Sequence, residues 1–236
     1  TLNEGDKIVV NKLLMGARIY TDFNFDADGV DLQSFRTKGL RSPMHNDIVV
    51  FNRPYHKGAI KFVINEVYCK RIVALPGDTL SIKKGVYCNN NYEGVLGLES
   101  EQSRLSMFSD SMLLLNTYDI GVFKGNLDWT IKDFGPYYVP RAGDLINITS
   151  KEAVLYKPLL EWELGKKISY DWINNSVYAD GEILTQHRFL HNYYFMAGDN
   201  VLDSSDSRYW GLVPEEYIVG IVNLIYSREK EQWLRV

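Results

Sequence analysis

A polar segment from residue 198 to residue 211 carries the side chains best suited to chemistry. It contains three Asp, three Ser, one Asn and one Arg, and it ends in Tyr-Trp-Gly. Asp, Asn and Ser side chains bond neighbouring backbone amides, so a loop of this composition keeps one shape without regular structure. Rigid loops often present reactive groups. The same residues are also typical of a plain hairpin loop in which Asp206 pairs with Arg208.

A second candidate is a lysine inside the apolar, β-branched segment 62–78. Strand geometry places Lys70 on one face with Tyr68, Ile72 and Ala74, and places Cys69, Arg71 and Val73 on the other. An ordinary lysine, with a pKa of ~10.4, is neutral in only about one molecule in a thousand near pH 7.4. Burial among apolar side chains would lower that pKa and produce a general base. The alternative is an edge-strand lysine that reaches water.

The elements that must position these residues are predicted to be mainly strands. Four segments begin with a Gly-Asp or Asn-Asp turn and continue as a β-rich run, at residues 5–12, 46–51, 77–82 and 143–148. Such units predict a mainly β protein with antiparallel sheets. Their irregular spacing excludes a repeat architecture. Residues 16–46 are predicted to be mostly loop.

The composition changes over residues 88–185. A Glu/Ser-rich piece predicts a short helix, and residues 152–163 predict a helix that Pro158 divides into two short pieces. Residues 177–183 predict a hairpin around Asp180-Gly181. We therefore expect residues 1–87 and 186–236 to form a β body that contains both candidate site segments, with residues 88–185 as an inserted subdomain that is also β-rich.

Composition and charge narrow the class of protein. The 236 residues are 45% hydrophobic with a net charge of -4, which predicts a folded protein and gives no reason to expect a nucleic-acid partner. No apolar run approaches the roughly 18 residues that span a bilayer, so we expect any membrane anchor to lie outside this sequence. Cys69 and Cys88 allow at most one internal disulfide, and their spacing does not decide whether it forms.

Two of these segments together resemble the type I signal peptidases, the Ser/Lys serine peptidases that remove signal peptides from exported proteins in bacteria. Lys70-Arg71 followed by Leu75-Pro76-Gly77-Asp78 is similar to that family's Lys-Arg…Pro-Gly-Asp box. Residues 198–211 are similar to its Gly-Asp-Asn…Ser-x-Asp-Ser-Arg box, and residues 46–51 to a shorter box that usually has Gly in place of Asn46. The resemblance covers residues 1–87 and 186–236, and it implies an antiparallel, β-barrel-like catalytic body.

The resemblance also implies roles for individual residues. Lys70 matches the general base, and Ser204 matches a serine whose hydroxyl positions the lysine amine. Asp206 and Arg208 match a pair that braces the loop, and Gly198 matches a glycine that permits close backbone approach. Tyr68 and Cys69 match the wall and the small-residue pockets of the substrate groove. The family's chemistry needs no cofactor and no metal.

The family's nucleophile belongs to a Ser-Met-x-Pro-Thr-Leu box, of which Thr1-Leu2 resembles the end. The resemblance then places the nucleophilic serine four residues before Thr1, and we expect residues 1–236 alone to be inactive. It implies exported preproteins and a lipid bilayer surface as partners, and no nucleic acid. It further implies a place on the bacterial cytoplasmic membrane, with the catalytic domain on the extracytoplasmic side.

Three other hypotheses stay open. A Ser-His-Asp peptidase is the weaker enzyme hypothesis, because His45, His56, His187 and His191 all lie outside the two motifs. A self-cleaving repressor with Ser/Lys chemistry would need a DNA-binding segment and an internal cleavage site, and the sequence shows neither. A catalytically inactive homologue that binds exported polypeptides or partners is the third. Trp129 and Trp162 are candidates either for a lipid interface or for the core.

Overall fold

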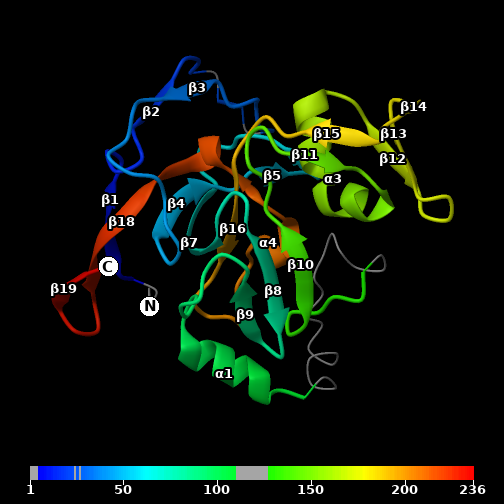
Figure 1. Cartoon of the computed structure of the whole chain (residues 1–236). Coiled ribbons are helices and arrows are strands. Elements are labelled where there is room, and N and C mark those ends of the chain that lie inside the picture. The colour runs from blue at the N-terminus through cyan, green and yellow to red at the C-terminus, as the bar shows by residue number, and fades with distance from the viewer. Residues whose placement is uncertain (1–4, 24, 27, 110–126) are drawn as a thin grey trace.

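The computed structural model describes residues 5–23, 25–26, 28–109 and 127–236. Its central feature is an antiparallel sheet with the strand order β1-β18-β4-β7-β16-β17, in which β19 also pairs with β18 (Figure 1). These strands are β1 (Lys7–Asn11), β4 (Ile48–Asn52), β7 (Val67–Ala74), β16 (Tyr193–Ala197), β17 (Val213–Pro214), β18 (Ile218–Ser227) and β19 (Gln232–Arg235). The predicted mainly β, antiparallel fold is confirmed. The described strands follow an open order and do not close into a barrel.

Pairing of β7 with β16 brings the two motif segments together. Ala197, the last residue of β16, lies opposite Arg71 of β7, so the loop that follows β16 begins beside Lys70. On its other side β7 pairs with β4, where Val49 lies opposite Lys70 and Val50 lies opposite Cys69. Every residue of β4 is buried, as expected for a strand packed on both faces. The scaffold beneath the candidate site is therefore a buried part of the sheet.

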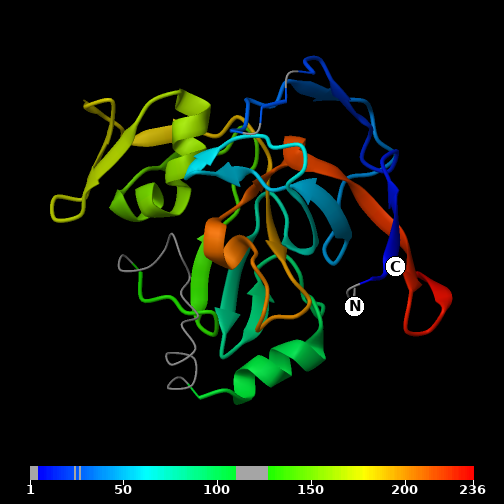
Figure 2. The same ribbon diagram turned by 180° about the vertical axis from the view of Figure 1, so that it is seen from behind.

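Smaller sheets surround the central one (Figure 2). Two of them have three strands: one contains β8 (Thr79–Lys83), β9 (Val86–Asn89) and β10 (Phe134–Tyr138), and the other contains β12 (Ile168–Asp171), β13 (Ser176–Ala179) and β14 (Glu182–Ile183). Three have two strands each: β2 (Arg18–Tyr20) with β3 (Ser34–Arg36), β5 (Tyr55–His56) with β6 (Ala59–Ile60), and β11 (Leu145–Asn147) with β15 (Gln186–Arg188). The helical elements are α1 (Glu99–Met107), α3 (Ser150–Leu164), α4 (Ser207–Trp210) and the 3-10 turn η2 (Glu215–Tyr217). The expected division of the chain into a body and an inserted subdomain stays a prediction. Strand β10 of the predicted insertion pairs with strand β8 of the predicted body.

One turn recurs at the four predicted strand starts. The residue before the Asp has a positive φ in each case: 90° at Gly5, 67° at Asn46, 95° at Gly77 and 92° at Gly143. In three of these turns the Asp carboxylate accepts the backbone N–H of the residue three positions earlier, as Asp47 does from Met44 at 2.8 Å. Each turn leads into β1, β4, β8 or β11, so these four predicted strands are confirmed.

The helix α3 differs from the prediction, because it runs unbroken through Pro158. Proline removes one hydrogen bond, but Thr149 and Glu152 form a capping box at the N-terminus, and the buried Leu155, Leu159 and Leu160 pack the helix against the core. The predicted short helix α1 and the β13–β14 hairpin at Asp180-Gly181 are confirmed. The short strands β2 and β3 were missed within residues 16–46. Among the described helices, none is long and apolar enough to cross a membrane.

Candidate active site

Lys70 and Ser204 meet where the loop after β16 passes over β7. The Lys70 Nζ atom lies 2.8 Å from the Ser204 Oγ atom and donates a hydrogen bond to it. The Ser204 hydroxyl in turn interacts with the Asp206 carboxylate. This orientation makes Ser204 a bridge between a lysine on the sheet and an aspartate in the loop.

Gly198 makes the Lys70–Ser204 contact possible. A Cβ atom at this position would lie 2.0 Å from Ser204 Oγ and 3.3 Å from Lys70 Nζ. The Gly198 N–H donates to Asp206 Oδ2 at 2.9 Å. The carboxylate that interacts with Ser204 therefore also holds the first residue of the loop. Any side chain at residue 198 would therefore separate the two polar groups.

Asp206 and Arg208 form an ion pair whose side chains are both completely buried. The Arg208 guanidinium donates from Nε to Asp206 Oδ1 at 2.9 Å and from Nη2 to Oδ2 at 2.8 Å. Burial alone would raise the pKa of Asp206, but the charge and hydrogen bonds of Arg208 outweigh it and hold that pKa below its ordinary value. Asp206 also caps the short helix α4 by accepting from Arg208 N. The pair thus fixes the loop without exposing its own charges.

The environment of Lys70 shifts its protonation equilibrium towards the neutral amine. Burial lowers the pKa of Lys70 below its ordinary value, the negative charge of Asp206 partly opposes this, and the positive charge of Arg208 adds to it. Tyr68 lies on the same face of β7, with its ring centroid 5.9 Å from the Lys70 Nζ. A lysine with a lowered pKa and a hydroxyl partner can take a proton from a second hydroxyl.

An ion pair that sequence reasoning missed holds the same loop from the other side. Arg71 donates to both carboxylate oxygens of Asp199, at 2.7 and 2.8 Å, and also to the Asn46 carbonyl oxygen at 3.0 Å. The Asn46 side chain anchors the segment 95–97 by donating to Val95 O and accepting from Gly97 N. Arg71 follows Lys70 in one motif, and Asp199 follows Gly198 in the other. Their opposite charges were the one sequence feature that could have predicted this ion pair.

A cavity of about 140 Å³ adjoins Lys70 and Ser204. Its walls are Ile48, Cys69, Lys70 and Arg71 from the sheet, and residues 198–200, 203 and 204 from the loop. Burial raises the pKa of the Cys69 thiol to about 11, and Cys69 and Cys88 are both free. The Tyr68 ring stacks on that of Phe51, with ring centroids 6.2 Å apart. Of the two predicted groove residues, the structure places Cys69 in the cavity wall and Tyr68 beside it.

The four histidines lie elsewhere. Each ring contacts a carboxylate outside this cavity: His45 contacts Asp78, His56 contacts Glu66, His187 contacts Glu163, and His191 contacts Glu216. Among the described residues, no group of three or more His, Cys, Asp or Glu side chains could hold a metal ion. The geometry therefore offers lysine, and not histidine, as the base at this position.

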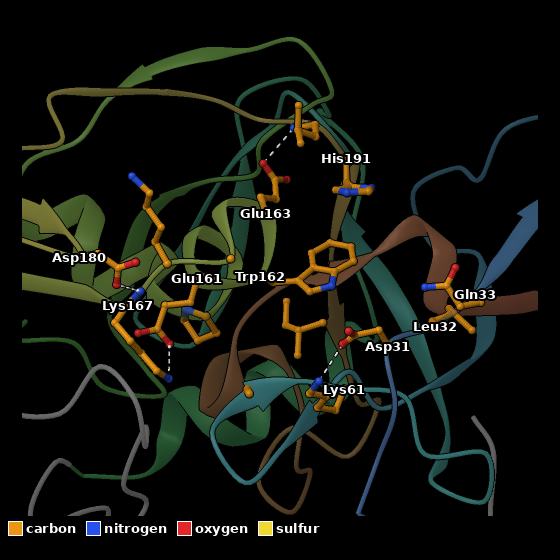
Figure 3. Close-up of a pocket in the computed structure, with 16 residues that line it drawn as sticks. Asp31, Leu32, Gln33, Lys61, Glu161, Trp162, Glu163, Lys167, Asp180 and His191 are labelled. Atoms are coloured by element: carbon orange, nitrogen blue, oxygen red, sulfur yellow. Dashed lines mark hydrogen bonds and ion pairs between the residues drawn. The ribbon is translucent and has the colours of Figure 1, made fainter. Parts of the chain in front are cut away.

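A larger cavity, of about 570 Å³, lies between the C-terminal end of α3 and the β5–β6 hairpin (Figure 3). Trp162 lies in its wall, with its ring 4.4 Å from that of His191. Its lysines are engaged with carboxylates, as Lys61 is with Asp31 at 2.8 Å and Lys166 with Glu182 at 2.8 Å. Trp129 instead packs against Phe134 in the core, at 4.5 Å between ring centroids. No local sequence pattern predicted this cavity.

The chain belongs to the signal peptidase, peptidase S26 family, whose sequence profile matches residues 1–227. It is 28% identical to a signal peptidase I from Buchnera aphidicola subsp. Schizaphis graminum, over 82% of this chain and 58% of that protein. It is 24% identical to a signal peptidase I from Pseudomonas aeruginosa, over 93% of this chain and 58% of that protein. The family predicted from the two motifs is confirmed, and the chain spans less than two thirds of these two relatives.

Among solved structures, a signal peptidase I from Enterococcus faecalis matches with a TM-score of 0.35 and 17% identity, covering 76% of this chain and 96% of that one. The predicted link between Thr1-Leu2 and the nucleophile box falls on residues 1–4, which lie outside the described residues.

Proposed function

We propose that this chain is the catalytic part of a membrane-associated serine endopeptidase that removes signal peptides from exported preproteins. One observation carries the proposal: Lys70 Nζ lies 2.8 Å from Ser204 Oγ in a setting whose burial lowers the pKa of the lysine. Membership of the signal peptidase family supports it. The named relatives, each a signal peptidase I, support the same substrate class.

In the proposed mechanism, neutral Lys70 accepts the proton of a serine hydroxyl that the family resemblance places four residues before Thr1. The serine oxygen attacks the peptide carbonyl, and the Lys70 ammonium returns its proton to the leaving amine. Lys70 then takes a proton from a water molecule, which hydrolyses the acyl-enzyme. Because Ser204 accepts from Lys70 while it interacts with Asp206, it holds the amine with its lone pair available for the nucleophile.

The proposal includes the cellular setting. The substrates are exported preproteins, the working surface is a lipid bilayer, and the catalytic part faces the extracytoplasmic side of the bacterial cytoplasmic membrane. Membership of the signal peptidase family supports this setting. Signal-peptide processing by the full-length protein in membrane vesicles would test it. An inactive homologue that binds exported chains would bind the same peptides and process none.

The chemistry is tested by extending this chain with its native upstream residues and measuring cleavage of a peptide with small residues before the scissile bond. The Lys70→Ala variant should lose about 10³-fold in kcat/KM, the usual contribution of a general base. Lys83→Ala, which removes an exposed lysine at the end of β8, serves as the matched control and should cleave like wild type. Equal cleavage by Lys70→Ala and wild type would exclude the Ser/Lys mechanism, and no cleavage by the extended wild type would favour the inactive homologue.

A further inference from the structure

The cavity beside Lys70 and Ser204 has an unbalanced set of charges. Its walls carry four charged side chains: Lys70, Arg71, Asp199 and Asp203. Arg71 and Asp199 cancel each other through two hydrogen bonds of 2.7 and 2.8 Å. The remaining charges are those of Lys70 and Asp203.

Lys70 and Asp203 do not form a second cancelling pair. Lys70 donates to Ser204 Oγ, and burial favours its neutral form. When Lys70 is neutral and ready to accept a proton, the summed charge of the cavity wall is that of Asp203 alone. The wall is therefore negative in the state that would react.

The loop directs Asp203 outward. Val201 and Leu202, the two residues before it, are 2% and 6% exposed and pack into the main core. Asp203 itself is exposed, and its N–H donates to Asn200 O at 3.1 Å in a tight turn. In the part of the chain that the structure describes, Asp203 takes part in no ion pair, so its carboxylate has no counter-charge from the protein.

We infer that Asp203 gives this site a preference for peptides that carry a basic residue close to the scissile bond. The inference rests on the proposed peptidase function and adds a specificity-determining residue to it. A peptide that reaches Lys70 and Ser204 must pass the same cavity wall, so a nearby Lys or Arg side chain meets an unpaired carboxylate. A Glu side chain at the same place is repelled.

The test uses the chain with its native upstream residues and a set of peptides with one small-residue cleavage sequence. The peptides differ only in carrying Lys, Gln or Glu, scanned over the three positions on each side of the scissile bond. At one position or more, wild type should favour Lys over Glu by about 3- to 10-fold in kcat/KM, the range expected when an exposed charge pair replaces a like-charge contact. The preference should shrink in 0.5 M NaCl, because salt screens exposed charges.

Asp203→Asn should bring the Lys-to-Glu ratio close to one, and Glu229→Gln, which removes an exposed carboxylate between β18 and β19, should leave the ratio as in wild type. An unchanged ratio in Asp203→Asn, or no charge preference at any position, overturns the inference. Binding of the same labelled peptides, followed by fluorescence anisotropy, separates the two proposals. A Lys preference in binding that depends on Asp203, without any cleavage, would retain the inference and reject the peptidase.

Discussion

A Cβ atom on Gly198 would lie 2.0 Å from the Ser204 hydroxyl oxygen, far closer than a Cβ atom approaches any non-bonded heavy atom. The contact is with the side chain that bridges Lys70 and Asp206. The absence of a side chain at residue 198 is therefore a condition for the geometry of the proposed base.

Gly198→Ala should lower kcat/KM by about 10²-fold or more, because the added methyl group displaces Ser204 and the lysine amine that it holds. It should also destabilise the fold by about 1–3 kcal/mol through overpacking. Adding Ser204→Gly removes the atoms nearest to the new methyl group, so urea denaturation should show recovered stability while activity stays low. Full activity of the single variant would contradict the geometry.

The pH dependence of cleavage should report the state of Lys70. Its ordinary pKa of 10.5 is lowered by burial, so kcat/KM should rise with pH along a limb whose midpoint lies below 10.5. The Asp206 charge favours the protonated amine and raises this pKa. Asp206→Asn should therefore move the limb to lower pH, and a shift to higher pH would contradict the assignment of the limb to Lys70.

Removing one partner of the buried Asp206–Arg208 pair should lower the free energy of unfolding more than replacing both partners with apolar residues. Arg208→Met leaves Asp206 buried without a counter-charge, and we expect a loss of about 3–5 kcal/mol in the free energy of unfolding. The double variant Asp206→Leu with Arg208→Met should lose less than the sum of the two single variants. Lys57→Ala, at the exposed ion pair with Asp28, serves as the control and should change little. Additive losses would contradict a coupled pair.

Asn46 combines a positive φ of 67° with side-chain bonds to Val95 and Gly97. Asn46→Gly keeps the backbone conformation accessible and removes the bonds, so it should cost about 1 kcal/mol. Asn46→Ala also places in the left-handed region a residue that tolerates it less well than Gly or Asn does, and should cost about 1 kcal/mol more. Thermal denaturation of the two variants gives the comparison. Equal melting temperatures would show that the backbone conformation contributes nothing.

Much of this architecture was accessible from local sequence patterns. The alternation along residues 67–74 predicted that Lys70 shares a face with Tyr68, and the Lys70 Nζ atom lies 5.9 Å from the centroid of the Tyr68 ring. The Gly-Asp and Asn-Asp turns predicted four strand starts, because a positive φ and an Asp acceptor are local properties of the chain. The approach of residues 70 and 204 followed from motif resemblance alone, since the pairing of β7 with β16 has no local signal.

The features that sequence reasoning missed depend on contacts between distant residues. Arg71 was expected to point away from the face that carries Lys70, but its ion pair with Asp199, 128 residues further along the chain, has no local signal. Pro158 was expected to interrupt α3, yet burial of one helix face outweighs one lost hydrogen bond. The cavity beside Trp162 arises from residues 31–33, 59–61 and 158–167, which no local pattern brings together.

Lys70 and Ser204 are 134 positions apart in the chain. Before the sheet assembles, the lysine amine is solvated and carries its ordinary proton, because burial, the main cause of its lowered pKa, comes from tertiary structure. The proton-accepting state is therefore a property of the finished fold and of no fragment of it. By the proposed mechanism, a chain that is still unfolded, or that has lost the β7–β16 pairing, would lack the lowered lysine pKa and so would not cleave itself or its neighbours.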